Sequence, residues 1–156
     1  MITDDSQDDI KIRTIDIEGK RITILLPDCP SQQFEDPSNV PGLYKHVDGI
    51  ILLFDVCNRG SLSHLQLFYP DIDRRAKENT PLLLLGNKCD KVMDRQIATS
   101  AAAEFADGMG LRYGEVSALL GTNVELEFIS FVRRVYLNAL DQELIVVKQK
   151  HKCVVG

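Results

Sequence analysis

After the first third of the chain, short apolar runs alternate with helical patterns, and this alternation limits the fold most. Residues 49–55 (GIILLFD) and 82–85 (LLLL) have the length and composition of buried strands. In residues 60–80, 96–107 and 122–140, apolar side chains recur at intervals of three or four, as on one face of a helix. We therefore predict an α/β fold with a mostly parallel, doubly wound sheet and helices on both faces.

The segment before this alternation has a different pattern. Residues 10–27 (IKIRTIDIEGKRITILLP) hold two β-type runs around Glu18-Gly19-Lys20, which predicts a hairpin with Gly19 in its turn. The apolar positions of the first run change parity between Ile12 and Ile15, which predicts either a bulge or an edge strand.

Composition limits the classes of function. The 156 residues are 44% hydrophobic, as expected of one globular domain, and the net charge of −5 argues against a general nucleic-acid binder. Four scattered cysteines have neither zinc-site nor disulfide-framework spacing, which favours a reduced, cytoplasmic setting. No apolar run approaches the roughly 18 residues that span a bilayer, and the acidic start differs from a signal peptide. Any membrane contact is therefore expected to be peripheral.

The run LLLL continues into Gly86-Asn87-Lys88-Cys89-Asp90, whose chemistry suits guanine recognition. A carboxylate at Asp90 can accept hydrogen bonds from the ring N–H and the exocyclic amine of guanine, a donor pair that adenine does not offer. Asn87 can bond the base edge or tie neighbouring loops together, and the stem of Lys88 can lie along the ring. The alternative is a chance turn after a strand, with Asp90 as its cap. LRYGEVSAL (residues 111–119) predicts a further short strand, and a second element at its end, Ser117-Ala118, can point a backbone N–H at the guanine carbonyl.

With these two elements in order, the chain resembles the Ras-like small GTPases, and the Rab branch most closely. The resemblance runs from about Ile10 to Tyr136 and includes IKIRTIDIEGKRITI, YKHVDGIILLFDV, GNKCD, AAEFADGMG and EVSALLGTNVELEF. It implies a P-loop NTPase-like G domain that binds GTP or GDP with Mg²⁺, and a switch that acts in vesicle trafficking through Rab effectors and regulators.

The resemblance also implies roles for single residues. Asn87, Lys88 and Asp90 match the guanine-specificity motif, and Ser117 with Ala118 matches the second base contact. Leu119 stands where the family has a Lys that packs over the nucleotide, so base binding is expected to be weaker.

The family's Asp-x-x-Gly-Gln element aligns with residues 28–32 (DCPSQ). Asp28 would face Mg²⁺ through water, and Gln32 would orient the attacking water. Ser31 replaces the family's Gly, and Pro30 stiffens the approach, so switching and hydrolysis are expected to be impaired. The alternatives are a solvated Gln32 and a local turn formed by Asp28.

No string Gly-x-x-x-x-Gly-Lys-Ser/Thr, the phosphate-binding loop, occurs in the chain. Aligned on the hairpin, the family's first strand, P-loop and first helix would precede Met1, which would leave a gap lined by unpaired backbone groups and apolar side chains. Three explanations stay open: a truncated sequence, which we favour, a degenerate relative that no longer binds nucleotide, or a partner that supplies the strand.

We predict a truncated Rab-like GTPase domain over residues 1–145 and a flexible basic tail over residues 146–156. Cys153, followed by two aliphatic residues and Gly156, has the shape of a prenylation box, and the lysines before it would add attraction to anionic lipid. A frayed basic tail is the alternative. A prenylated Cys153 would hold the protein on the cytosolic face of endomembranes.

The function expected by resemblance is that of a monomeric GTPase switch with slow GTP hydrolysis in its complete form. The competing hypothesis is a non-catalytic interaction module, a pseudo-GTPase that keeps the fold without binding nucleotide. In both cases the expected partners are proteins and membranes, with no nucleic acid among them.

Overall fold

The structure is a computed structural model that describes residues 10–27 and 42–152, with side chains described for residues 10–27 and 44–143. The chain divides into two compact units, Met1–Pro41 and Gly42–Gly156.

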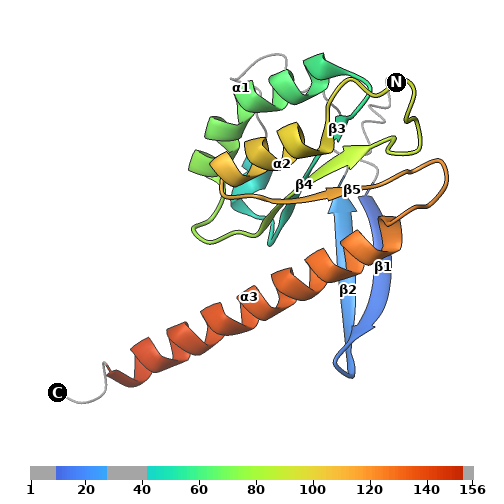
Figure 1. Cartoon of the computed structure of the whole chain (residues 1–156). Helices are drawn as coiled ribbons and strands as arrows, with labels where there is room; N and C mark the ends of the chain where they lie inside the picture. The colour runs from blue at the N-terminus through green and yellow to red at the C-terminus, as the bar shows by residue number, and fades with distance from the viewer. Residues whose placement is uncertain (1–9, 28–41, 153–156) are drawn as a thin grey trace, which may run out of the picture. The chain divides into compact units, whose positions relative to one another are not determined.

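The described part of the first unit is the predicted hairpin (Figure 1). Strand β1 (Ile10–Ile17) pairs antiparallel with β2 (Lys20–Pro27), and Ile17 is paired with Lys20 across a two-residue turn. Both turn residues have positive φ, 52° at Glu18 and 77° at Gly19, which matches the twist of antiparallel strands. Every β1 residue has one partner in β2, so the predicted bulge is wrong. In a two-stranded sheet both strands are edges, which agrees with the other alternative.

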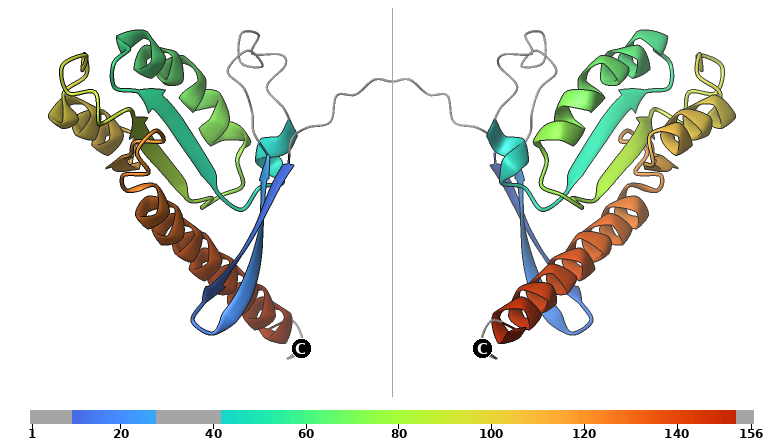
Figure 2. Two further views of the ribbon diagram at one scale, coloured as in Figure 1. Left: turned by 90° about the vertical axis from the view of Figure 1, so that its right-hand side faces the viewer. Right: turned by 90° about the vertical axis from the view of Figure 1, so that its left-hand side faces the viewer.

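The second unit is built around a parallel sheet. After a short 3-10 helix η3 (Gly42–Lys45), the elements follow as β3 (Ile50–Asp55), α1 (Arg59–Arg75), β4 (Leu82–Asn87), α2 (Thr99–Gly108), β5 (Arg112–Glu115) and α3 (Val124–Lys152). The strand order is β3-β4-β5, and both pairs are parallel. Helices α1 and α2 lie on one face of the sheet and α3 lies on the other (Figures 1 and 2). The prediction of a parallel sheet covered on both faces is confirmed.

Side chains on both faces of β4 are packed in the core. Leu83 and Leu85 pack with Val116 and Phe131 on the side of α3. On the opposite side Leu84 is fully buried, as is Ala106 of α2. Because β4 is apolar on both faces, it forms the centre of this unit.

Strand β3 has a strand partner on one side only among the described residues, namely β4. Its side chains alternate between buried and more exposed positions, and Leu53 is 58% exposed. Both outer strands of a three-stranded sheet have one open edge, so the expectation of a gap beside β3 stays a prediction.

Helix α3 is a single helix from Val124 to Lys152, so it continues past the boundary expected at residue 145. The division into a domain over residues 1–145 and a tail over 146–156 stays a prediction.

Candidate functional site

The carboxyl ends of the three parallel strands bring Asn87, which the sequence singles out, beside two acidic residues that it does not. Asp55 ends β3, Asn87 ends β4 and Glu115 ends β5. The register pairs Asp55 with Asn87, so their side chains start from neighbouring positions. Ligands of open parallel sheets bind beyond this edge.

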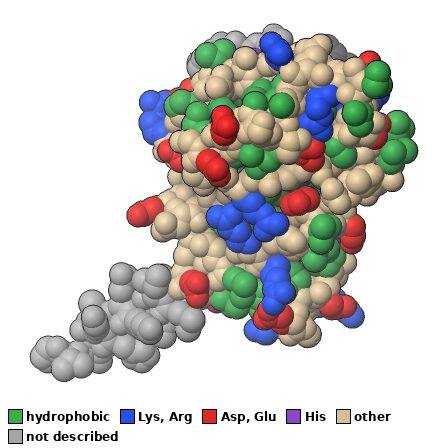
Figure 3. All heavy atoms as spheres, in the orientation of Figure 1, with side chains coloured by type: hydrophobic (Ala, Val, Ile, Leu, Met, Phe, Trp, Pro, Cys, Tyr) green, Lys and Arg blue, Asp and Glu red, His purple; other side chains and the backbone are tan. Residues whose placement is uncertain are grey.

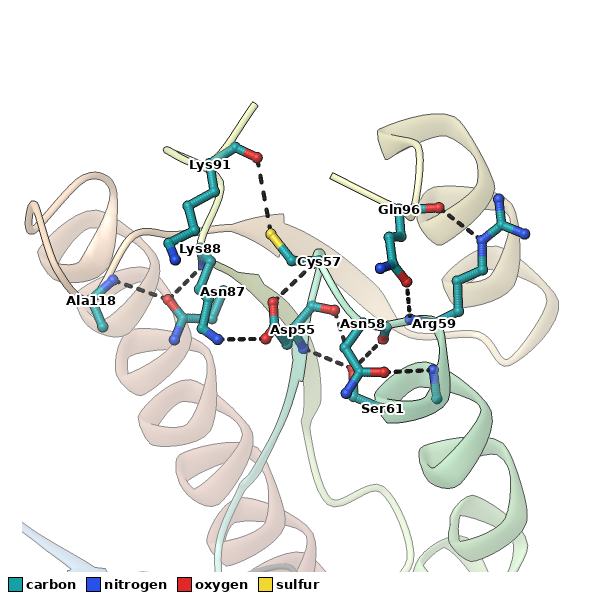
Figure 4. Close-up of polar contacts among 11 residues, drawn as sticks. Asp55, Cys57, Asn58, Arg59, Ser61, Asn87, Lys88, Lys91, Gln96 and Ala118 are labelled. Carbon is teal, nitrogen blue, oxygen red and sulfur yellow. Dashed lines mark hydrogen bonds and ion pairs between the residues drawn. The ribbon is translucent and has the colours of Figure 1, made fainter. Parts of the chain in front are cut away.

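Asn87 ties the loop after β4 to the loop after β5. Its Oδ1 accepts hydrogen bonds from the backbone N–H of Lys88 at 2.8 Å and from that of Ala118 at 3.0 Å (Figure 4). Of the two roles that the sequence suggested for Asn87, the structure shows the tie between loops. The N–H of Ala118 is therefore engaged by Asn87, and its contact with guanine stays a prediction.

Lys88 is held by an ion pair with the end of the neighbouring strand. Its Nζ lies 2.5 Å from Asp55 Oδ2, while Asp55 Oδ1 accepts a hydrogen bond from the Cys57 N–H at 2.9 Å (Figure 4). Burial alone would raise the pKa of Asp55, but the hydrogen bonds from Lys88 and Cys57 lower it. The hydrogen bond to Asp55 raises the pKa of Lys88 in turn. Both groups are therefore charged at neutral pH.

Asp90 is one of two residues, with Glu127, that have a buried side-chain oxygen without a hydrogen-bond partner in the described part of the chain. Its side chain is half-buried, and its Oδ1 is buried without any hydrogen-bond partner there. A buried carboxylate oxygen without a donor is costly, because it has lost water and gained nothing in exchange. Guanine carries two adjacent N–H donors, so Asp90 fits the base by its chemistry.

The turn that presents Asp90 is fixed by the backbone on both sides. The Cys89 N–H donates to Val116 O at 3.1 Å, and the Lys91 N–H donates to Lys88 O at 3.0 Å. Lys88 itself has φ of 68°, a left-handed conformation that costs a non-glycine residue free energy. Such strain is often found at ligand sites, and here it turns the chain sharply before Asp90.

The second element lies beside this turn. Ser117 is completely buried, and its Oγ accepts a hydrogen bond from the Leu120 N–H at 3.1 Å. Its own N–H donates to Thr122 O at 3.0 Å, which closes the loop. The side chain of Leu119 is 77% exposed. Ser117 therefore shapes the loop from within, whereas Leu119 projects from it.

A cluster that the sequence reasoning missed supports the same edge. The guanidinium of Arg95 binds Glu115 at 2.7 and 2.9 Å, and the hydroxyls of Tyr113 and Thr99 donate to Glu115 Oε1 at 2.6 and 3.0 Å. Arg95, through this hydrogen bonding, lowers the pKa of Glu115. The loop after β4, which carries Asp90, is thereby attached to β5. No spacing rule connects Arg95 with Glu115, so only the path of the loop reveals the pair.

Three of the predicted site residues, Asp28, Gln32 and Cys153, lie outside the described residues. Their roles in Mg²⁺ binding, hydrolysis and lipidation stay predictions. Within residues 10–27 and 44–143, no group of three or more His, Cys, Asp or Glu side chains could hold a metal ion. In the same part of the chain, no helix is long and apolar enough to cross a membrane.

Comparisons with known proteins agree with this arrangement. Residues 4–137 match the model of the Ras family. GTP-binding protein ypt2 of Schizosaccharomyces pombe is 32% identical over 135 residues, which cover 86% of this chain and 67% of that protein. A family match over most of the chain, together with the strand-end geometry, establishes the family: the chain belongs to the Ras family and is a Rab-like small GTPase.

Proposed function

We propose that the edge formed by the ends of β4 and β5 binds the base of a guanine nucleotide. Asp90 would accept hydrogen bonds from the two guanine donors, and the Lys88 stem would lie along the ring. Asn87 would keep the two loops at a fixed separation. The observation that carries the proposal is the buried Asp90 Oδ1, which has no hydrogen-bond partner among the described residues.

The two loops support this role because they are ordered by bonds that do not use Asp90. Asn87 holds Ala118, Cys89 is bonded to Val116, and Arg95 is bonded to Glu115. A preorganised site loses less conformational entropy when it binds. Ser117 and Ala118 would form the wall beside the guanine carbonyl.

Titration of the chain with fluorescent GDP tests the proposal. We expect binding that unlabelled GTP and GDP displace and ATP does not. Asp90→Ala should abolish it, whereas Asp94→Ala, which removes an exposed carboxylate from the same loop, should not. Binding that survives Asp90→Ala, or that ATP displaces equally well, would refute guanine recognition by Asp90.

We further propose that the protein acts in vesicle trafficking as a Rab-like switch with impaired hydrolysis. Asp28 would face Mg²⁺, and Gln32 would orient the water for hydrolysis, with Ser31 and Pro30 limiting the movement of that segment. Single-turnover hydrolysis of GTP measures this step. If Gln32→Leu hydrolyses GTP as fast as the unmodified chain, Gln32 does not take part in hydrolysis.

A pseudo-GTPase module is the second candidate, and one observation favours it. Asn87 is bonded to the backbone of Lys88 and Ala118, and Lys88 is paired with Asp55, so these polar groups have partners within the chain itself. If the chain binds neither GDP nor GTP yet keeps its fold by circular dichroism, this candidate replaces the switch.

Membrane attachment through Cys153 belongs to the same proposal. The sequence Cys153-Val-Val-Gly156 supports it, because a cysteine followed by two aliphatic residues has the shape of a prenylation box. A prenyltransferase assay with labelled isoprenoid donors should label the chain and not Cys153→Ser. Equal labelling of both proteins would refute attachment at this cysteine.

A further inference from the structure

We propose that a hollow at the amino-terminal ends of β4 and β5, opposite the base site, binds a compact ligand with more than one phosphate group. The hollow has a volume of about 670 Å³, which is within the range of small-molecule sites. The loop at residues 79–81, the start of β5 and the middle of α3 form its walls.

Positive charge gathers in this hollow. Arg112, Arg133 and Arg134 line it, and Asp141 is the acidic residue among the lining side chains. Figure 3 shows a group of Lys and Arg side chains, with Asp and Glu side chains near it. The concentration is unusual for a chain whose net charge is −5. Guanidinium groups donate paired N–H bonds in the geometry that phosphate oxygens accept.

Two of these arginines, Arg112 and Arg134, can form further hydrogen bonds. Arg112 is 48% exposed, and its ion pair with Glu127 is long, at 3.7 Å. Arg134 is exposed and forms no ion pair or hydrogen bond within the described part of the chain. Ser130 and Asn138, also in the lining, add neutral donors beside the charges. A phosphate group would therefore meet both charge and hydrogen bonds.

A compact polyanion fits better than an acidic protein surface. A large acidic partner would face the overall negative charge of the chain as well as the hollow, and that repulsion opposes association. A small phosphate ligand lies within about a Debye length of the arginines, so the local field dominates. The same chemistry is offered by a soluble inositol phosphate and by the headgroup of a phosphoinositide lipid.

Isothermal titration of the full chain with inositol 1,4,5-trisphosphate tests the site. We expect saturable binding that weakens at least about tenfold in Arg112→Gln and Arg134→Gln and falls as salt is raised. Arg74→Gln removes one positive charge from α1, outside the hollow, and should leave the affinity unchanged. Asp90→Ala should also leave it unchanged, which separates this site from the base site.

Flotation with phosphatidylcholine vesicles, with and without phosphatidylinositol 4,5-bisphosphate, distinguishes a lipid headgroup from a soluble ligand. Protein that floats only with vesicles containing the phosphoinositide indicates a headgroup site. Binding that is seen by titration and not by flotation indicates a soluble ligand. Circular dichroism shows that the Arg variants remain folded. Binding no tighter than that of inorganic sulfate, tighter binding of a poly-glutamate peptide, or equal affinity in Arg112→Gln and Arg134→Gln would overturn the proposal.

Discussion

The Nζ of Lys88 lies 2.5 Å from Oδ2 of Asp55, so an ion pair joins the ends of β4 and β3. The two residues are 33 positions apart in the chain, and the parallel register makes them neighbours. The pair holds a long, flexible side chain beside the proposed base site.

We expect Asp55→Asn to weaken GDP binding modestly, because Lys88 then loses the charge that fixes its position. The pair is partly exposed, so its contribution is small, and the affinity should fall about fivefold at most. The loss should shrink as salt screens the pair. Fluorescence titration at low and high salt measures it, and Asp94→Asn is the matched control. A loss that does not depend on salt would contradict this explanation.

Asp90→Asn is expected to change the base that the site prefers. The amide would present an N–H donor where the carboxylate accepts, and xanthine carries a carbonyl where guanine carries the amine. We expect at least about a tenfold loss for GDP and a gain for xanthosine diphosphate. Competition titrations with both nucleotides check it. Parallel losses for the two nucleotides would show that Asp90 does not contact that position.

Asn87→Ala should destabilise the second unit, because the N–H groups of Lys88 and Ala118 both lose their acceptor. We expect a cost of about 1–2 kcal/mol in the free energy of unfolding, measured by urea denaturation. Asn87→Asp keeps an oxygen acceptor and should lose less. If both variants are equally destabilised, the two hydrogen bonds are not the cause.

The stability that Glu115 contributes should depend on pH. Hydrogen bonding to Arg95 lowers its pKa in the folded protein below the ordinary value of 4.5, so the folded state favours the carboxylate. The contribution is therefore complete above about pH 4.5 and is lost as the pH falls through the folded-state pKa. Glu115→Gln should cost about 1–3 kcal/mol near neutral pH and less in acid. Urea denaturation across this range measures the difference, and a cost that stays constant down to acid pH would contradict the ion pair.

Leu119→Lys is expected to strengthen nucleotide binding. Leu119 is 77% exposed, so a longer side chain fits without repacking, and a lysine stem could cover one face of the base. We expect a gain of about threefold to tenfold in GDP affinity. Leu120→Lys, at a neighbouring position that is 69% exposed, is the control for added charge. Equal gains in the two variants would point to general attraction of the phosphates.

The sequence predicts the second unit well because its strands are apolar and short and its helices keep their period. The hairpin is equally clear, since Glu18 and Gly19 suit a tight turn, but the change of parity after Ile12 suggested a bulge that does not exist. Pairing with β2 continues in register because backbone hydrogen bonds do not depend on which face is apolar.

The site is predictable in part. Asn87, Lys88 and Asp90 carry a recognisable spacing, and the parallel sheet brings them to one edge. The hydrogen-bond and ion-pair partners of these residues are not predictable from the sequence. Asp55 and Glu115 come from β3 and β5, and their side-chain contacts depend on loop paths that no local pattern encodes. The tie from Asn87 to Ala118 was one of two alternatives, and only the structure distinguishes them.

Because Asn87 ties the loop after β4 to Ala118 in the loop after β5, we expect the two loops to open together. An amide that exchanges its hydrogen with solvent must first break its bond, so the N–H groups of Ala118 and Cys89 report on the same local opening. A ligand held by both loops would slow exchange at these amides together and leave the hairpin at its own rate. The two loops of the proposed base site would thus open and close as one cooperative unit.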